Sequence, residues 1–101
     1  MTESPLLCAI GIPWYRREQY ACVLRVMEDA ATLPRTFDDW EGRAERMYDI
    51  CLKAGGQPFR AELEPATFVA WCSEHALHRN ADARLKYAKV LAQLYSESER
   101  N

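Results

Sequence analysis

TFDDWEGRAERMYDICLKAGGQPFRAELEP, residues 36–65 of the 101-residue chain, contains the signals for a complete helix, a strand and the start of another helix. Thr36 is a typical N-cap, because its hydroxyl can accept a hydrogen bond from the backbone N–H of Asp39. Apolar residues then recur at three- and four-residue steps, which indicates one core-facing stripe. They are Phe37, Trp40, Ala44, Met47, Tyr48, Cys51 and Leu52. We predict a helix over 37–54 that ends at Gly55-Gly56, since glycine readily adopts the left-handed conformation of a helix stop.

The residues after the two glycines alternate between apolar and charged. Phe59, Ala61 and Leu63 fall on one face of an extended chain, and charged residues fall on the other. This alternation predicts a half-covered strand over 57–64. Pro65 suits the first turn of a further helix over 65–78, because the N–H that proline lacks has no partner in that turn.

The first third of the chain predicts a short strand and a long helix. Leu6 to Ile10 is a continuous apolar run, typical of a strand that is buried on both faces. Pro13 suits the first turn of a helix over 14–31. Leu33-Pro34 ends that helix, because the residue before a proline avoids the helical conformation.

The last predicted helix covers residues 81–96. Asn80 is its N-cap, and Asp82 complements the positive end of the helix dipole. We expect residues 1–4 and 97–101 to be frayed. The whole chain, residues 1–101, is then a single domain, because its length suits one hydrophobic core and is too short for two.

These elements follow one another in the order strand, helix, helix, strand, helix, helix. The fold class is therefore α+β, mostly helical, with a small two-stranded sheet. Two strands are marginally stable unless helices cover them or a second copy of the chain extends the sheet. The sequence therefore favours a homodimer, in which the sheet is extended by dimerisation.

A second feature also favours a homodimer. The predicted helices 14–31 and 81–96 are apolar over more than half of their circumference, which is more than one small core hides. The candidate dimer interface comprises Tyr15, Cys22, Val26, Leu85 and Tyr95. An unidentified protein partner is the other occupant that we expect for such a surface.

The composition is that of an ordinary globular domain, with 49% hydrophobic residues, 28% charged residues and a net charge of −2. Nucleic-acid binding is not expected, because it usually requires a strongly basic face. The sequence shows neither a signal peptide nor an apolar run long enough to cross a membrane. We expect a cytoplasmic protein, whose four dispersed cysteines stay reduced.

A candidate ligand site lies at the start of the first predicted helix. Trp14, Tyr15, Arg16 and Arg17 combine two aromatic rings and two guanidinium groups near free backbone N–H groups, which attract anions. The same residues also fit a packing role, with the rings in the core and the arginines in water. Neighbouring residues on a helix diverge, which favours the packing role.

No cluster in the sequence has the pattern of a metal or catalytic site. Cys72, His75 and His78 follow one another at three-residue steps, but these steps rotate around a helix and do not converge. We expect no metal and no cofactor. The predicted function is a non-enzymatic interaction or accessory domain; the alternative is a module that binds a small ligand or anion, with an enzymatic activity left open.

Spaced prolines and aromatic residues give the chain a resemblance to one family. The motifs are Pro13-Trp14-Tyr15 with Tyr20, then Leu33-Pro34-x-Thr36-Phe37-x-x-Trp40, and Pro65-x-x-Phe68-x-x-Trp71-Cys72. In these motifs the chain resembles a family of short bacterial proteins that has no assigned activity. The resemblance spans about residues 11–85 and implies a bacterial cytosolic protein.

Overall fold

The computed structural model describes the backbone of residues 10–100 and the side chains of residues 10–98. This part of the chain forms two strands, four α-helices and two short 3-10 helices. In chain order they are β1 (Ile10–Trp14), η2 (Arg17–Gln19), α1 (Tyr20–Val26), η3 (Ala30–Thr32), α2 (Phe37–Lys53), β2 (Pro58–Glu62), α3 (Pro65–Glu74) and α4 (Ala81–Arg100). The predicted fold class, mostly helical α+β with a two-stranded sheet, is confirmed.

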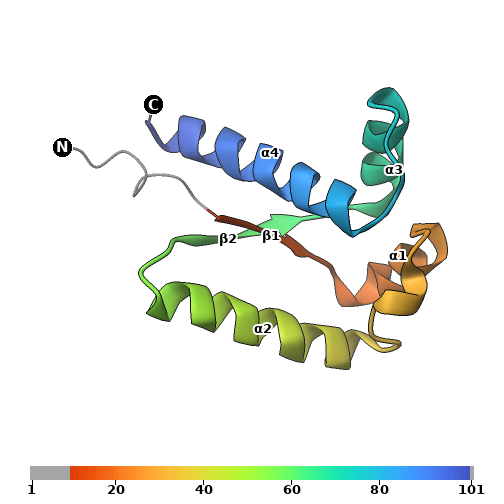
Figure 1. Ribbon diagram of the computed structural model, residues 1–101, viewed down its shortest axis with the longest axis horizontal. Coiled ribbons are helices and arrows are strands. Elements are labelled where there is room, and N and C mark those ends of the chain that lie inside the picture. Colours follow the sequence, from red (N-terminus) through yellow and green to blue (C-terminus); the bar gives the residue numbers. More distant parts are fainter. Residues whose placement is uncertain (1–9, 101) are drawn as a thin grey trace.

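The two strands are parallel, and they form the middle layer of the molecule. Ile10 of β1 lies opposite Pro58 of β2, and Trp14 lies opposite Glu62. Helix α2 lies on one side of the sheet and α4 on the other, while α1 and α3 lie beyond the ends of the strands (Figure 1). The edge of β1 away from β2 has no paired strand among the described residues.

Aromatic rings fill the core where the strands end. Tyr15 and Trp40 lie with their ring centroids 4.7 Å apart, and Tyr20 and Phe37 join them. On the other side, the Tyr87 ring of α4 meets the Phe68 ring of α3 edge-on, with centroids 5.4 Å apart. These contacts attach α2 and α4 to the same end of the sheet.

The first strand differs from the prediction in its position. Ile10 is the first described residue, so residues 6–9 of the predicted strand lie outside the described residues. Pro13, predicted for a helix start, lies inside β1. The strand tolerates Pro13 because alternate residues of β1 direct their backbone N–H and C=O groups towards β2. Ile10 donates its N–H to Gln57 and Trp14 accepts from Leu63, so Pro13 faces the open edge, where its missing N–H breaks no ladder bond.

The predicted long helix over 14–31 is wrong. Only Tyr20–Val26 is α-helical, and Met27 is extended with φ −84° and ψ 131°. The chain breaks there because the next two carboxylates are held by the segment before α4. Glu28 accepts from the Arg79 N–H, and Asp29 accepts from the Ala81 N–H.

The other helices start as the sequence predicts. The Thr36 hydroxyl accepts from the Asp39 N–H at 3.1 Å, and the Asn80 side chain accepts from the Ala83 N–H at 3.1 Å. Helix α4 continues to Arg100, so residues 97–100 of the tail that we expected to be frayed are helical. Residues 1–4 lie outside the described residues.

Candidate functional site

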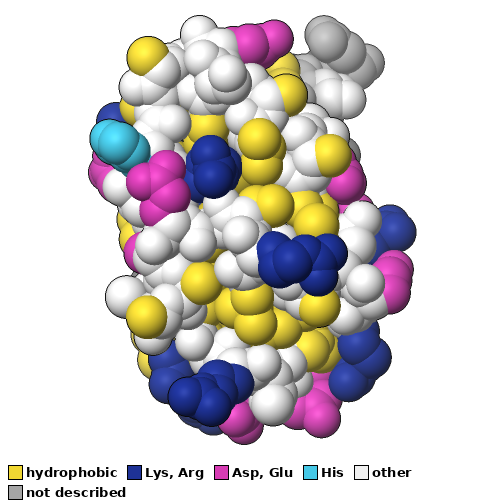
Figure 2. Space-filling model, turned by 90° about the vertical axis from the view of Figure 1, so that its right-hand side faces the viewer, with side chains coloured by type: hydrophobic (Ala, Val, Ile, Leu, Met, Phe, Trp, Pro, Cys, Tyr) yellow, Lys and Arg dark blue, Asp and Glu magenta, His cyan; other side chains and the backbone are white. Residues whose placement is uncertain are grey.

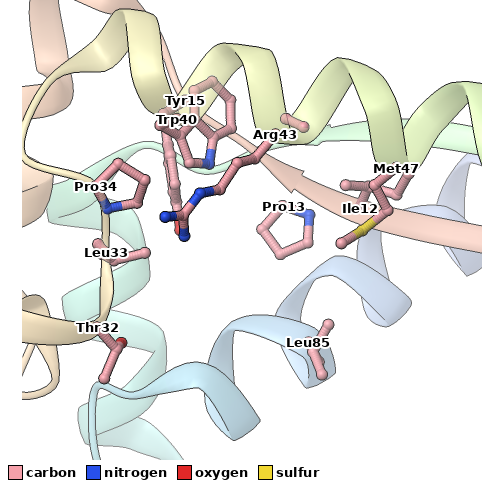
Figure 3. Close-up of a pocket in the computed structure, with 11 residues that line it drawn as sticks. Ile12, Pro13, Tyr15, Thr32, Leu33, Pro34, Trp40, Arg43, Met47 and Leu85 are labelled. Carbon is pink, nitrogen blue, oxygen red and sulfur yellow. The ribbon is translucent and has the colours of Figure 1, made fainter.

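An apolar pocket lies beside the open edge of β1 (Figure 3). Its volume is about 220 Å³, and its lining comes from β1, α2, α4 and the segment before α2, but not from β2. The lining residues are Ile12, Pro13, Tyr15, Thr32, Leu33, Pro34, Trp40, Arg43, Ala44, Met47 and Leu85. We call this hollow the edge pocket.

Arg43 is the one charged residue in that lining. Its side chain extends from α2 into the edge pocket, and the guanidinium lies towards Leu33 and Pro34 (Figure 3). It makes no ion pair with another described residue. Burial raises the pKa of the nearby Tyr20 hydroxyl, and the positive charge of Arg43 partly opposes that rise. Arg43 is thus a cation beside an apolar wall, with no carboxylate partner among the described residues.

Tyr15 lines the pocket from the core side. Its side chain is only 3% exposed, and burial raises its pKa to about 12, so the hydroxyl stays protonated. This position corrects the prediction that Tyr15 belongs to a dimer interface, because the ring is already covered by its own chain. Tyr15 can contact a ligand only through the small part of its side chain that lines the edge pocket.

Sequence analysis did not identify one ion pair of this part of the molecule, between Arg84 and Asp29. Arg84 is 6% exposed and donates to both oxygens of Asp29, at 2.7 and 3.1 Å. These hydrogen bonds from Arg84 are the main cause that lowers the pKa of the Asp29 carboxyl. The pair fixes the start of α4 against the segment that follows α1. The sequence offered little indication of this pair, since an arginine on an apolar helix face usually extends its guanidinium to water.

The structure does not bring Trp14, Arg16 and Arg17 of the predicted ligand site together. Arg16 pairs with Glu62 at 3.2 Å, and Arg17 pairs with Asp38 at 2.8 Å. The Trp14 ring packs edge-on against Trp40, with centroids 5.3 Å apart. The two guanidinium groups therefore diverge and are each matched by a carboxylate. The packing alternative for these residues agrees with the structure.

The remaining residues of the predicted dimer interface do not form one surface. Cys22 and Val26 are half-buried on α1. Leu85 is 59% exposed at the pocket, whereas Tyr95, on the part of α4 away from α1, stacks on Phe59 with centroids 4.6 Å apart. On the face that carries α1 and α3, hydrophobic side chains reach the surface between charged ones (Figure 2). Of the five residues of the predicted interface, only Leu85 combines high exposure with a pocket position.

Eight large hydrophobic side chains of the described residues are at least 38% exposed, and four of them belong to β1, to the α2 stripe that lines the edge pocket, or to the pocket wall on α4. Ile10 starts β1, Leu85 and Met47 line the edge pocket, and Ile50 continues the α2 stripe of Arg43 and Met47. We call Ile10, Met47, Ile50 and Leu85 the edge surface. Leu52, Val90, Leu94 and Tyr95 are the other four.

The described residues contain no group of three potential metal ligands that lie together. His75 contacts the Trp71 carbonyl through Nδ1 at 2.8 Å, whereas His78 points to Glu28 at 3.1 Å. Within residues 10–100 no helix is both long enough and apolar enough to cross a membrane. The chain matches no protein-family model, no curated protein and no solved structure.

Proposed function

We propose that this chain is a non-catalytic interaction domain that forms a homodimer across the open edge of β1. The observation that carries the proposal is the edge surface. Its four side chains are between 50% and 68% exposed, and they come from three different elements, β1, α2 and α4. Exposed apolar patches mark interaction sites, and we infer that these side chains form one.

A second copy suits this surface because the edge of β1, which pairs with no other strand of the described residues, occurs once in each copy. Two-fold apposition brings each edge surface against its own equivalent. Pro13 has no N–H to donate at this edge, which limits a continuous ladder between two β1 strands. The dimer therefore rests on side-chain packing of Ile10, Met47, Ile50 and Leu85 more than on strand pairing.

A bacterial origin and a cytoplasmic location belong to the same proposal. The family resemblance supports the first. The second is supported by the free thiols of Cys22, Cys51 and Cys72 among the described residues, since disulfides are rare in cytosolic proteins. An unidentified second protein at the edge surface is the competing occupant, and the measurement below separates it from a second copy.

The test is a charge placed on the edge surface. Ile50 is 68% exposed, so Ile50→Glu removes no core contact and should leave the monomer folded. We expect the variant to be monomeric at concentrations at which the natural chain is dimeric, because a buried unpaired carboxylate is costly. Sedimentation equilibrium measures the subunit number, and circular dichroism checks the fold.

Leu52→Glu is the matched control. Leu52 is 50% exposed on the same helix, but two residues further along, which places it on roughly the opposite side of α2. We expect this variant to remain dimeric. A natural chain that is monomeric at all concentrations would refute the proposal and would leave a different protein as the occupant. Dissociation by Leu52→Glu but not by Ile50→Glu would place the interface elsewhere.

A further inference from the structure

We propose that the edge pocket binds a small amphipathic carboxylate, an unbranched aliphatic acid of about the size of octanoate, with Arg43 as its counter-ion. The inference goes beyond the proposed dimer, because a single copy of the chain already contains the whole pocket. It rests on three observations: the pocket volume, the apolar character of its walls and the unpaired guanidinium within them.

The volume suits a small molecule. At about 220 Å³ the edge pocket is larger than an apolar cavity of about 150 Å³ that admits benzene. It is also bounded on several sides. Ile12 and Pro13 of β1 form the floor, α2 and α4 form the walls, and Leu33-Pro34 closes one end (Figure 3). A closed end favours a short ligand over a continuous polypeptide.

The walls determine the apolar part of the ligand. Met47 and Leu85 face each other across the pocket from α2 and α4, at the end away from Pro34 (Figure 3). Both are more than half exposed in the absence of a ligand, so an aliphatic chain between them would remove apolar surface from water. A flexible thioether such as that of Met47 adapts well to such a chain.

Arg43 determines the charged part of the ligand. A guanidinium presents a planar pair of donors that matches a carboxylate in a bidentate geometry. Other arginines of the chain already make such pairs, as Arg84 does with Asp29 and Arg16 does with Glu62. Arg43 makes none with another described residue, and its guanidinium lies at the Pro34 end of the pocket (Figure 3). One carboxylate at that end, with the chain running towards Met47, satisfies both parts of the site.

The experiment is a titration of the natural chain with octanoate, followed by two-dimensional amide NMR. We expect the amide resonances of pocket residues on β1, α2 and the 32–34 segment to shift as octanoate is added, until the shifts reach a plateau. Octanol has the same chain without the charge and should bind about tenfold or more weakly, because charge-assisted hydrogen bonds contribute about 1.5–3 kcal/mol. Equal shifts with octanol, or none with octanoate, would overturn the proposal.

Two arginine variants sharpen the result. Arg43→Leu should weaken octanoate binding about tenfold or more, whereas Arg43→Lys should retain part of it, since the charge remains. Arg46→Leu is the control, because Arg46 lies on the same helix but does not line the pocket. Undiminished binding by Arg43→Leu would exclude Arg43 as the counter-ion. Amide spectra of the free variants establish that each is folded.

The same titration separates this inference from the proposed dimer. Ile50 does not line the edge pocket, so the Ile50→Glu variant should still bind octanoate, and its subunit number reports on the dimer alone. A natural chain that is monomeric before octanoate is added, and that then binds it, would support the pocket and refute the dimer. A dimer that does not bind octanoate would support the proposed dimer and refute the proposed ligand of the pocket.

Discussion

Ala76 has a backbone conformation that its side chain disfavours. It follows α3 with φ 54°, and it is the only described residue other than glycine with a positive φ. Two hydrogen bonds hold it there: Ala76 donates to Ser73 at 3.3 Å, and Leu77 donates to Cys72 at 2.9 Å. This arrangement is a Schellman motif, in which glycine is the favoured residue. It ends α3 at Glu74 instead of at the predicted residue 78.

We predict that Ala76→Gly stabilises the protein by about 1 kcal/mol, because it removes the clash of Cβ in a left-handed conformation. The melting temperature should rise by about 5 °C, which differential scanning calorimetry measures. Gly55 provides the reciprocal variant, since it occupies the same position after α2 with φ 90° and has open space where Cβ would lie. Gly55→Ala should destabilise by a similar amount. A decrease in stability for Ala76→Gly would contradict this account.

At the scale of elements, the contact between β1 and α4 depends on small residues. A Cβ on Gly11 would lie 2.3 Å from the carbonyl oxygen of Ala88, and Ala88 itself is fully buried. The backbone of the helix and the backbone of the strand therefore approach more closely than any side chain at position 11 permits. This contact places α4, and with it Leu85, beside the open edge of β1.

We predict that Gly11→Ala destabilises the protein by about 3 kcal/mol, because the methyl group meets backbone that cannot rotate away. Chemical denaturation measures the change in the free energy of unfolding. Gly42→Ala is the control, because only the end of the Arg46 side chain lies near, at 3.7 Å. That variant should gain up to about 1 kcal/mol, since alanine favours a helix interior. A neutral Gly11→Ala would indicate that α4 packs differently.

The elements that local signals specify could be predicted from the sequence. Helix α2 has a cap, a single apolar stripe and a glycine stop, and strand β2 has a clear alternation. The region of β1 and α1 could not be predicted. Pro13 suits a helix start as well as an open strand edge, and only pairing with β2 decides between them. The break after Val26 depends on contacts with residues more than fifty positions away.

The predicted ligand site and the edge pocket differ for the same reason. Local sequence showed Arg16 and Arg17 beside two aromatic rings, but Glu62 and Asp38, distant in sequence, pair with both. Arg43 is not part of the apolar stripe of the predicted helix 37–54, and nothing near it in the sequence shows that it faces an open strand edge. The edge pocket exists only once β1, α2 and α4 are assembled.

At the scale of the whole molecule, the segment that follows α1 is joined to the start of α4 by a dense set of polar contacts. Glu28 donates its backbone N–H to the Arg79 carbonyl at 2.8 Å, and its side chain accepts from the Arg79 N–H at 3.1 Å. Asp29 binds both the Ala81 N–H and the Arg84 guanidinium. These contacts connect the first half of the chain to the second, and they hold the closed end of the edge pocket against α4.

Asp29 should therefore be the carboxylate whose removal costs most among those paired with arginine. We predict that Asp29→Asn lowers the free energy of unfolding near neutral pH by about 3 kcal/mol, because it leaves the buried Arg84 charge without a counter-ion. Asp38→Asn is the control. Asp38 pairs with Arg17 at the surface, where such a pair contributes at most about 1 kcal/mol. Urea denaturation of the three proteins measures both differences.

The pH dependence of this difference follows from the direction of the pKa shift. Folding lowers the pKa of Asp29, so the stability that its carboxylate contributes is present above the unfolded pKa of about 4. That contribution is lost as the pH falls through the lower pKa of the folded protein. The natural chain should therefore lose its advantage over Asp29→Asn progressively below about pH 4, whereas at higher pH the two curves run parallel. A difference that stayed constant into acid would mean that packing at Asp29, and not its charge, joins the two halves.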